Sequence, residues 1–290
     1  MAHAGADNPA VMPGEKVFAM FDGWTGKFER GLRRWLRRID RQGVRLVTAA
    51  EQHIGRLALF WCLLLGVIVA ARLAITATVD HDRGAWLLSA SIYGLLLLSP
   101  LIGLFLAAQA FPRGQLFALP DIPIARFGTW RRVDPLTAHA HRSFGVSGLL
   151  VGFVIGLLIN IVLRTAEFLS AVPSMAGVGP GWPQTLFLTL AADCILFNIL
   201  YGAVFVMALR HVPWFPRVML LIWLTDIVSQ LYMARILGGQ ALPEGVADAL
   251  VKLLGGNIRK SLISIALWLP YFLLSERVNI TYRRRVRVEE

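Results

Sequence analysis

The sequence predicts an all-α, polytopic integral membrane protein with six transmembrane helices and both termini in the cytoplasm. Of its 290 residues, 56% are hydrophobic and only 16% are charged, whereas soluble domains carry about 45–50% apolar and about 25% charged residues. The apolar residues form stretches close to the roughly 20 residues that cross a bilayer. These observations exclude an ordinary soluble domain and a disordered chain, and two cysteines exclude a disulfide scaffold.

A basic amphipathic helix is expected before the first apolar stretch. Residues 1–27 are rich in Ala, Gly and Pro, and we expect them to be loosely ordered. In residues 28–55, apolar side chains recur at three- and four-residue steps between arginines, a pattern typical of a helix lying among lipid headgroups. The lipid-surface residues of this helix would be Arg33, Trp35, Arg37 and Arg41. The alternative is an ordinary positive flank that happens to be helical, and no motif indicates nucleic acid as a partner.

The membrane segments fall into two groups. An N-terminal two-helix module spans 56–111, a cytoplasmic connection with four prolines spans 112–143, and a four-helix domain spans 144–285, followed by a short tail at 286–290. Between Phe111 and Arg142 we expect an irregular strap against the inner headgroups. The six predicted spans are 57–78, 86–111, 144–169, 186–209, 218–237 and 261–274.

The sixth span is the shortest and contains Pro270, which is expected to kink the helix. Residues 243–254 are expected to form a separate surface helix that stops at Gly255-Gly256. A five-span alternative would place the basic cluster 283–287 outside the cell, so we favour six.

The orientation follows from the basic residues, which cytoplasmic segments retain. Of the 29 lysines and arginines, about 22 fall on one side of the six-span arrangement and about four on the other. We therefore expect both termini in the cytoplasm of a bacterial inner-membrane protein. More than fifty largely polar residues precede the first span, so no cleaved leader is expected.

Charged residues inside the spans are costly and therefore informative. All but one fall in the outer half of their spans, where they would converge on an outward-facing polar pocket. Arg164 is expected to pair with Glu167 three residues away, and Asp193 with Arg72 or Arg235. They are either structural pairs and snorkelling arginines, or the lining of a solute or proton path. The predicted cluster consists of Arg72, Arg164, Glu167, Asp193, Asp226 and Arg235.

Small residues mark one ridge of the third span. Gly148, Gly152 and Gly156 form two overlapping GxxxG units, which permit close approach of another helix. We favour packing within the chain over a homodimer face.

No motif for catalysis or cofactor binding is present: G-x-S-x-G, H-E-x-x-H, a P-loop and CxxC are all missing. His139, His141 and His53 lack the spacing and the acidic or cysteine partners of a metal site. We therefore expect no cofactor and no metal.

The second half of the chain resembles an uncharacterised bacterial inner-membrane family, domain of unknown function family 2569. The resemblance begins with the Gly-rich segment 145–150 and continues with Trp214-Phe215-Pro216-Arg217. It ends on a segment similar to W-x-P-Y-F-x-x-S-x-R-V-x-x-T, and it implies a four-helix unit but no activity. The residues of that closing segment are Trp268, Pro270, Tyr271, Phe272, Ser275, Arg277, Val278 and Thr281.

Physical reasoning assigns simple roles to this closing segment. Trp268 and Tyr271 would lie at interfacial depth, Ser275 would cap freed backbone groups and Arg277 would bind a lipid phosphate.

The leading functional hypothesis is a non-enzymatic membrane component that acts through membrane lipids or a partner membrane protein. The alternative is a small-solute or proton-coupled carrier that uses the Arg/Asp cluster. A third hypothesis, a membrane enzyme acting on lipid, has the least support from the sequence.

Overall fold

The computed structural model describes residues 44–45, 48–49, 52–79, 83–121, 127–172 and 181–288, and 79% of it is helical. The lipid-surface residues Arg33, Trp35, Arg37 and Arg41 lie outside the described residues, so the interfacial helix remains a prediction.

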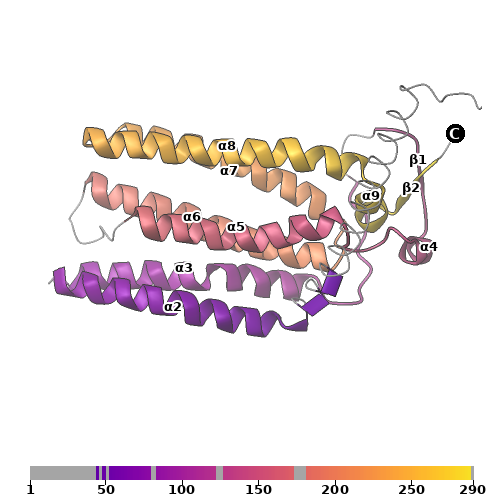
Figure 1. Ribbon diagram of the computed structural model, residues 1–290, viewed down its shortest axis with the longest axis horizontal. Helices are drawn as coiled ribbons and strands as arrows, with labels where there is room; N and C mark the ends of the chain where they lie inside the picture. Colours follow the sequence, from indigo (N-terminus) through magenta and orange to yellow (C-terminus); the bar gives the residue numbers. More distant parts are fainter. Residues whose placement is uncertain are drawn as a thin grey trace, which may run out of the picture.

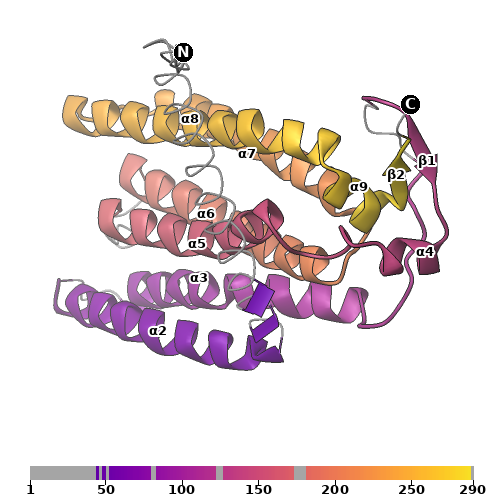
Figure 2. The ribbon, with the colours of Figure 1, turned by 45° about the vertical axis from the view of Figure 1, so that its right-hand side comes forward.

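Six long helices form three layers of two, with α5 and α6 between the other pairs (Figures 1 and 2). Helix α6 is the centre of the bundle, because it packs against α3, α5 and α7. Successive helices run in opposite directions, so α2 begins and α8 ends at the same end of the bundle (Figure 1). The long helices are α2 (Ile54–Val79), α3 (Arg83–Ala110), α5 (Leu149–Ala171), α6 (Trp182–Leu209), α7 (Phe215–Gly238) and α8 (Glu244–Leu274).

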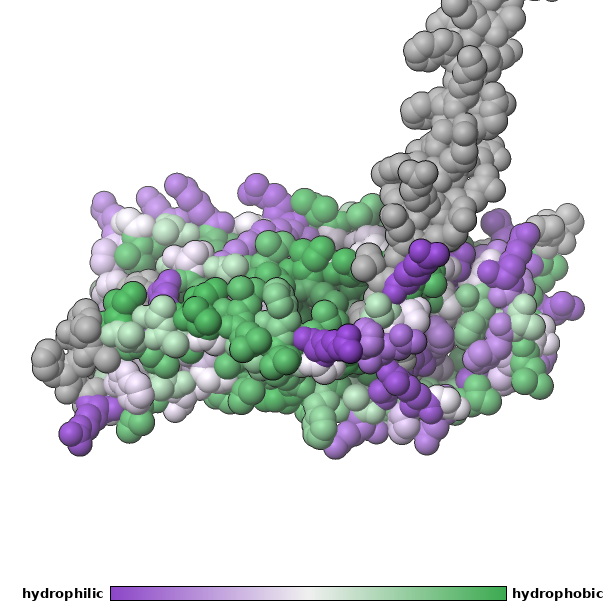
Figure 3. All heavy atoms as spheres, turned by 60° about the horizontal axis from the view of Figure 1, so that its bottom comes forward, coloured by the Kyte–Doolittle hydropathy of each residue, from purple (hydrophilic) through white to green (hydrophobic). Residues whose placement is uncertain are grey.

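The composition and length of these helices support a membrane protein. Five of them are long and apolar enough to cross a bilayer, and α8 with the following α9 (Glu276–Arg283) forms a bent pair that makes a sixth candidate. Burial is lowest in α2, where 11% of the apolar window is buried inside the protein, against 61% in α6. Apolar residues dominate the middle of the face formed by α2 and α3 (Figure 3), as a surface in contact with lipid requires.

The prediction for the last span is wrong in two respects. Helix α8 runs without interruption from Glu244 to Leu274, so 243–254 is its first part and not a separate surface helix. Gly255 and Gly256 lie inside it, so they do not stop the helix as predicted. Helix α8 continues through Pro270, and after its end the axis turns by 72° at Ser275 into α9.

The third span also starts later than predicted. Helix α5 begins at Leu149 and not at Phe144. Gly145 and Gly148 have φ values of +91° and +63°, which side-chain-bearing residues rarely adopt, so the segment before Leu149 turns instead of continuing the helix. Gly148 is accordingly the N-cap of α5 and not part of a packing ridge.

A small cap covers one end of the bundle (Figure 2). It consists of α4 (Pro135–Ala140), α9, and the strands β1 (Trp130–Arg132) and β2 (Arg285–Arg287), which pair antiparallel with Arg131 opposite Val286. We predicted an irregular connection between the two membrane modules, but it contains β1 and α4. Residue 286 was predicted to begin the tail, but it belongs to β2.

Close helix approach occurs at glycines of α3 and α6 and not at the predicted glycines of α5. A Cβ on Gly202 of α6 would lie 2.5 Å from the Pro100 carbonyl oxygen of α3, and a Cβ on Gly103 of α3 would collide with the Ile199 carbonyl. At Gly152 and Gly156 of α5 a Cβ would meet no atom within 4 Å. The predicted close packing within the chain is therefore wrong for α5, and the α3–α6 contact is the tight one.

Candidate functional site

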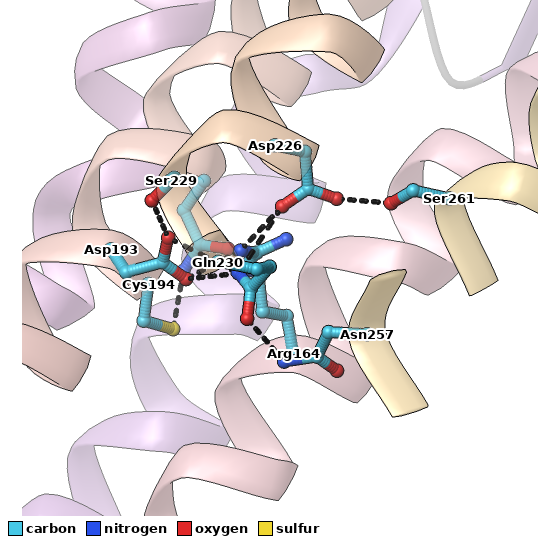
Figure 4. Close-up of polar contacts among 9 residues, drawn as sticks. Arg164, Asp193, Cys194, Asp226, Ser229, Gln230, Asn257 and Ser261 are labelled. Carbon is cyan, nitrogen blue, oxygen red and sulfur yellow. Dashed lines mark hydrogen bonds and ion pairs between the residues drawn. The ribbon is translucent and has the colours of Figure 1, made fainter. Parts of the chain in front are cut away.

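Three charged side chains from three helices meet inside the bundle. Nη2 of Arg164 on α5 lies 2.5 Å from Oδ2 of Asp193 on α6 and 3.0 Å from Oδ1 of Asp226 on α7. None of the three side chains is more than 13% exposed. Figure 4 shows the guanidinium between the two carboxylates. We call these three residues the Arg164 triad.

Polar side chains on α7 and α8 satisfy the remaining oxygen atoms of the triad. Ser229 donates to Oδ1 of Asp193 at 2.6 Å, and Ser261 donates to Oδ2 of Asp226. Gln230 lies 3.5 Å from both carboxylates and accepts a hydrogen bond from Asn257 at 3.2 Å. The network therefore joins α5, α6, α7 and α8 (Figure 4), and the polar groups match one another as buried groups must.

The triad holds one positive and two negative formal charges. The Phe197 ring lies 4.2 Å from the guanidinium carbon of Arg164 and adds a cation–π contact, but it supplies no charge. Burying an uncompensated charge is costly. The arrangement is therefore suited to hold one further positive charge, either a proton or a bound cation.

A cavity of about 280 Å³ reaches the triad between α5, α7 and α8. Arg164 and Asp226 form part of its wall, and Gly152 and Gly156 leave space beside them. The end towards the cap is aromatic. Its aromatic lining residues are Phe153, Tyr201, Trp223 and Trp268.

The opposite end of the cavity carries a balanced ion pair. Lys260 of α8 bonds to Glu167 of α5, and both side chains are exposed, at 60% and 42%. The predicted pairing of Arg164 with Glu167 is therefore wrong: Arg164 points across the bundle and Glu167 points towards α8. Because this pair is neutral as a whole, it leaves the excess negative charge of the triad unchanged.

Two other members of the predicted cluster lie apart from the triad. Arg72 of α2 donates to the backbone carbonyls of Val172, at 3.4 Å, and Leu169. Arg235 of α7 is exposed on the outside of the bundle. The predicted neutralisation of Asp193 by either residue is therefore wrong, because Arg164 already occupies that position. The convergent pocket contains three of the six predicted residues, with Glu167 at its rim.

Sequence reasoning missed the polar residues that complete the network. Ser229 and Gln230 lie about one turn after Asp226 on the same helix, and this spacing was a usable signal. Asn257 and Ser261 are also one turn apart. They were overlooked because Gly255-Gly256 suggested that the preceding helix ended there.

The closing family-like segment packs the cap onto the bundle. Phe272 is 1% exposed and stacks on Trp223 with ring centroids 5.7 Å apart. Thr281 accepts a hydrogen bond from the Gly145 backbone at 3.0 Å, and Arg277 donates to Ser147. These contacts tie α9 to the segment before α5.

Other residues of the segment differ from prediction or fill the interior. The Ser275 side chain makes no capping bond, so its predicted role is wrong. Arg277 donates to Ser147, and its contact with a lipid phosphate stays a prediction. Val278 is fully buried and Trp268 contacts Phe153 with centroids 5.0 Å apart. Pro270 and Tyr271 lie within the last turns of α8.

Among the described residues, no group of three or more His, Cys, Asp or Glu side chains is placed to hold a metal ion. No curated protein and no solved structure matches the chain. Its second half, however, matches the model of a family described as "Protein of unknown function (DUF2569)" over residues 144–283. That stretch contains α5 to α9 and therefore the whole triad, its hydrogen-bond partners and the cavity. Residues 144–283 thus form a domain of the DUF2569 family.

Proposed function

We propose that the protein is a non-enzymatic, multi-pass inner-membrane carrier that exchanges a small cationic solute for a proton at the Arg164 triad. The observation that carries this proposal is the excess of one buried carboxylate at the wall of a cavity. A buried site with an unmatched negative charge favours whichever cation reaches it. Proton and solute would therefore compete for the same charge, which is the basis of exchange.

The lining of the cavity supports an organic ammonium ion as the solute class. Aromatic faces attract cations within about 6 Å, and the side chains of Trp223 and Trp268 line the same cavity as Asp226. Because Arg164 is already paired with both carboxylates, a second positive group would be attracted by Asp226 and by the ring faces. The solute is therefore expected to be positively charged and partly apolar.

The proposed orientation places the cap in the cytoplasm. The cap and the helix ends beside it contain most of the basic residues of the described chain, whereas α8 carries Lys252, Arg259 and Lys260 near the other end. Positive segments are retained in the cytoplasm. Both chain termini would then be cytoplasmic.

The test is cation-driven proton movement in proteoliposomes that contain the full chain and a trapped pH indicator, with tetraethylammonium as the probe. The native protein should release protons when tetraethylammonium is added, and Asp226→Asn should reduce the rate to that of empty vesicles. Asp248→Asn is the matched control, because Asp248 is exposed on α8 far from the triad. Proton release that is unchanged in Asp226→Asn, or absent from the native protein, would contradict the proposal.

A second candidate function is contact with lipid or a partner membrane protein, and the exposure of α2 favours it. Leu64 and Val67 on α2 are 49% and 71% exposed, so their face is free to contact a partner helix. Cysteine substitution at Val67 followed by crosslinking in native membranes would test this. Crosslinks to one defined protein support a partner, and equal labelling by a lipid-soluble reagent all around α2 supports lipid alone.

A further inference from the structure

A second pocket lies in the cap, at the opposite end of the domain from the Glu167–Lys260 pair. Its volume is about 240 Å³, and it lies between the start of α7, the end of α9 and the two strands. Four arginines line it, together with one acidic residue, Asp121, which is exposed. We call it the cap pocket. Its arginines are Arg132, Arg217, Arg283 and Arg285.

Arg283 is the unusual member of the cap pocket. It is only 7% exposed, and its Nη1 donates to Oδ1 of Asn279 at 3.2 Å. Its Nε and Nη2 atoms are buried and have no hydrogen-bond partner in the described part of the chain. Leaving buried donors of a charged group unsatisfied costs more free energy than leaving those of a neutral group unsatisfied. Within the described residues, these two donors of a group that lines the pocket therefore lack a partner.

Neighbouring charges make this arrangement less favourable still. Arg217 and Arg285 are close enough to Arg283 to repel its charge. Arg285 also donates to Asn279 Oδ1, at 2.8 Å, and lies 5.6 Å from the centroid of the Trp130 ring. Within the described residues that line the pocket, four guanidinium groups thus face a single carboxylate.

We propose that the cap pocket binds a phosphate group, with Arg283 as its buried anchor. Guanidinium groups bind phosphate oxygens through paired, charge-assisted hydrogen bonds. A phosphate carries enough acceptor oxygens for the free donors of Arg283 and for Arg217 and Arg285 together, which a single carboxylate does not. The pocket also leaves room for a substituent, so an anionic lipid headgroup and a free phosphate share the required chemistry. This proposal does not depend on the carrier proposal.

The experiment measures binding to the full-length protein in a zwitterionic detergent. Binding of inorganic phosphate is measured by calorimetric titration, with chloride at the same ionic strength as the control. The thermal stability of the protein is then compared between nanodiscs of phosphatidylcholine and nanodiscs that also contain phosphatidic acid. Arg283→Gln should weaken binding by about tenfold or more, as expected for loss of a charge-assisted pair. Arg131→Gln is the matched control, because Arg131 lies on the same strand as Arg132 but does not line the pocket.

Each outcome decides the proposal. Saturable binding of inorganic phosphate that Arg283→Gln weakens identifies a free phosphate ligand, and thermal stabilisation by phosphatidic acid alone identifies a headgroup. If neither probe binds, or if Arg131→Gln weakens binding as much as Arg283→Gln, the proposal is wrong. Should Arg283→Gln fail to fold, Arg217→Gln provides the second variant, since Arg217 lies on another element and is half-buried.

Discussion

The charge count of the Arg164 triad predicts that neutral substitutions of its members change the free energy of unfolding by very different amounts. Arg164→Gln removes the positive charge between Asp193 and Asp226, which lie 2.5 and 3.0 Å from it, and leaves two buried carboxylates facing each other. Breaking a buried ion pair in this way typically costs about 3–5 kcal/mol. We therefore expect the free energy of unfolding to fall by about that amount.

Asp226→Asn should have a much smaller effect on stability. The amide oxygen still accepts from Arg164, and the amide nitrogen can donate to Ser261, whose hydroxyl also accepts. The substitution removes one attraction, but it also removes the desolvation of a carboxylate and its repulsion by Asp193. We expect the free energy of unfolding to change by less than about 1 kcal/mol.

The assay is unfolding by SDS titration in mixed micelles, followed by far-UV circular dichroism. In the double variant, Asp226→Asn should restore at least half of the stability that Arg164→Gln removes, because one unpaired carboxylate remains in place of two. If Asp226→Asn costs as much as Arg164→Gln and the two losses add, the network does not depend on its charge balance. The carrier proposal would then lose its main support.

Three further predictions concern packing, pH and the cap. Gly202→Ala should lower the free energy of unfolding by about 1–3 kcal/mol through overpacking, whereas Gly156→Ala should leave it unchanged or raise it by up to about 1 kcal/mol. Thermal unfolding in detergent compares the two variants. A reduced dimer content of Gly156→Ala would indicate that this face of α5 forms a homodimer. Burial lowers the pKa of His211 from 6.5 to about 4. As the pH falls below 6.5, this histidine therefore becomes protonated in the unfolded chain but stays neutral in the folded chain. About 2 kcal/mol of stability should be lost by about pH 5, and His211→Asn, which tolerates the positive φ, should flatten this dependence. Tyr282→Phe should cost about 1 kcal/mol, because the buried hydroxyl donates to the Ala208 carbonyl at 2.9 Å, and the same unfolding assay should detect it.

The apolar stretches were readable from the sequence because hydropathy acts along the chain. The positions of α2, α3, α6 and α7 follow the predicted spans within a few residues, and the coincidence of charges from different spans at one depth was predicted. The partners were not, because they depend on how each helix is rotated about its axis. Arg164 faces Asp193 and not Glu167 for that reason.

Features that depend on distant pairing were beyond the reach of sequence patterns. The basic run at 283–287 was interpreted as a positive flank, yet it contains β2. In the antiparallel sheet Arg285 of β2 lies opposite Arg132 of β1, and the two strands are about 150 residues apart in the sequence. Gly255-Gly256 was interpreted as a stop, although the packing of α8 on α7 keeps the helix intact through both residues. In each case a local signal was outweighed by contacts that only the folded chain contains.

The two proposed sites require ions of opposite sign, and this makes them separable by experiment. Helix α7 contributes to both, since Arg217 lines the cap pocket and Asp226 belongs to the triad nine residues later, about 13 Å along the helix. Among the described residues, the two cavities share no lining residue. Phosphate should therefore alter the stability of the cap without changing the tetraethylammonium response, and Asp226→Asn should leave phosphate binding intact. If Asp226→Asn abolished both the tetraethylammonium response and phosphate binding, α7 would move as a rigid body, so that occupation of one site changes the other.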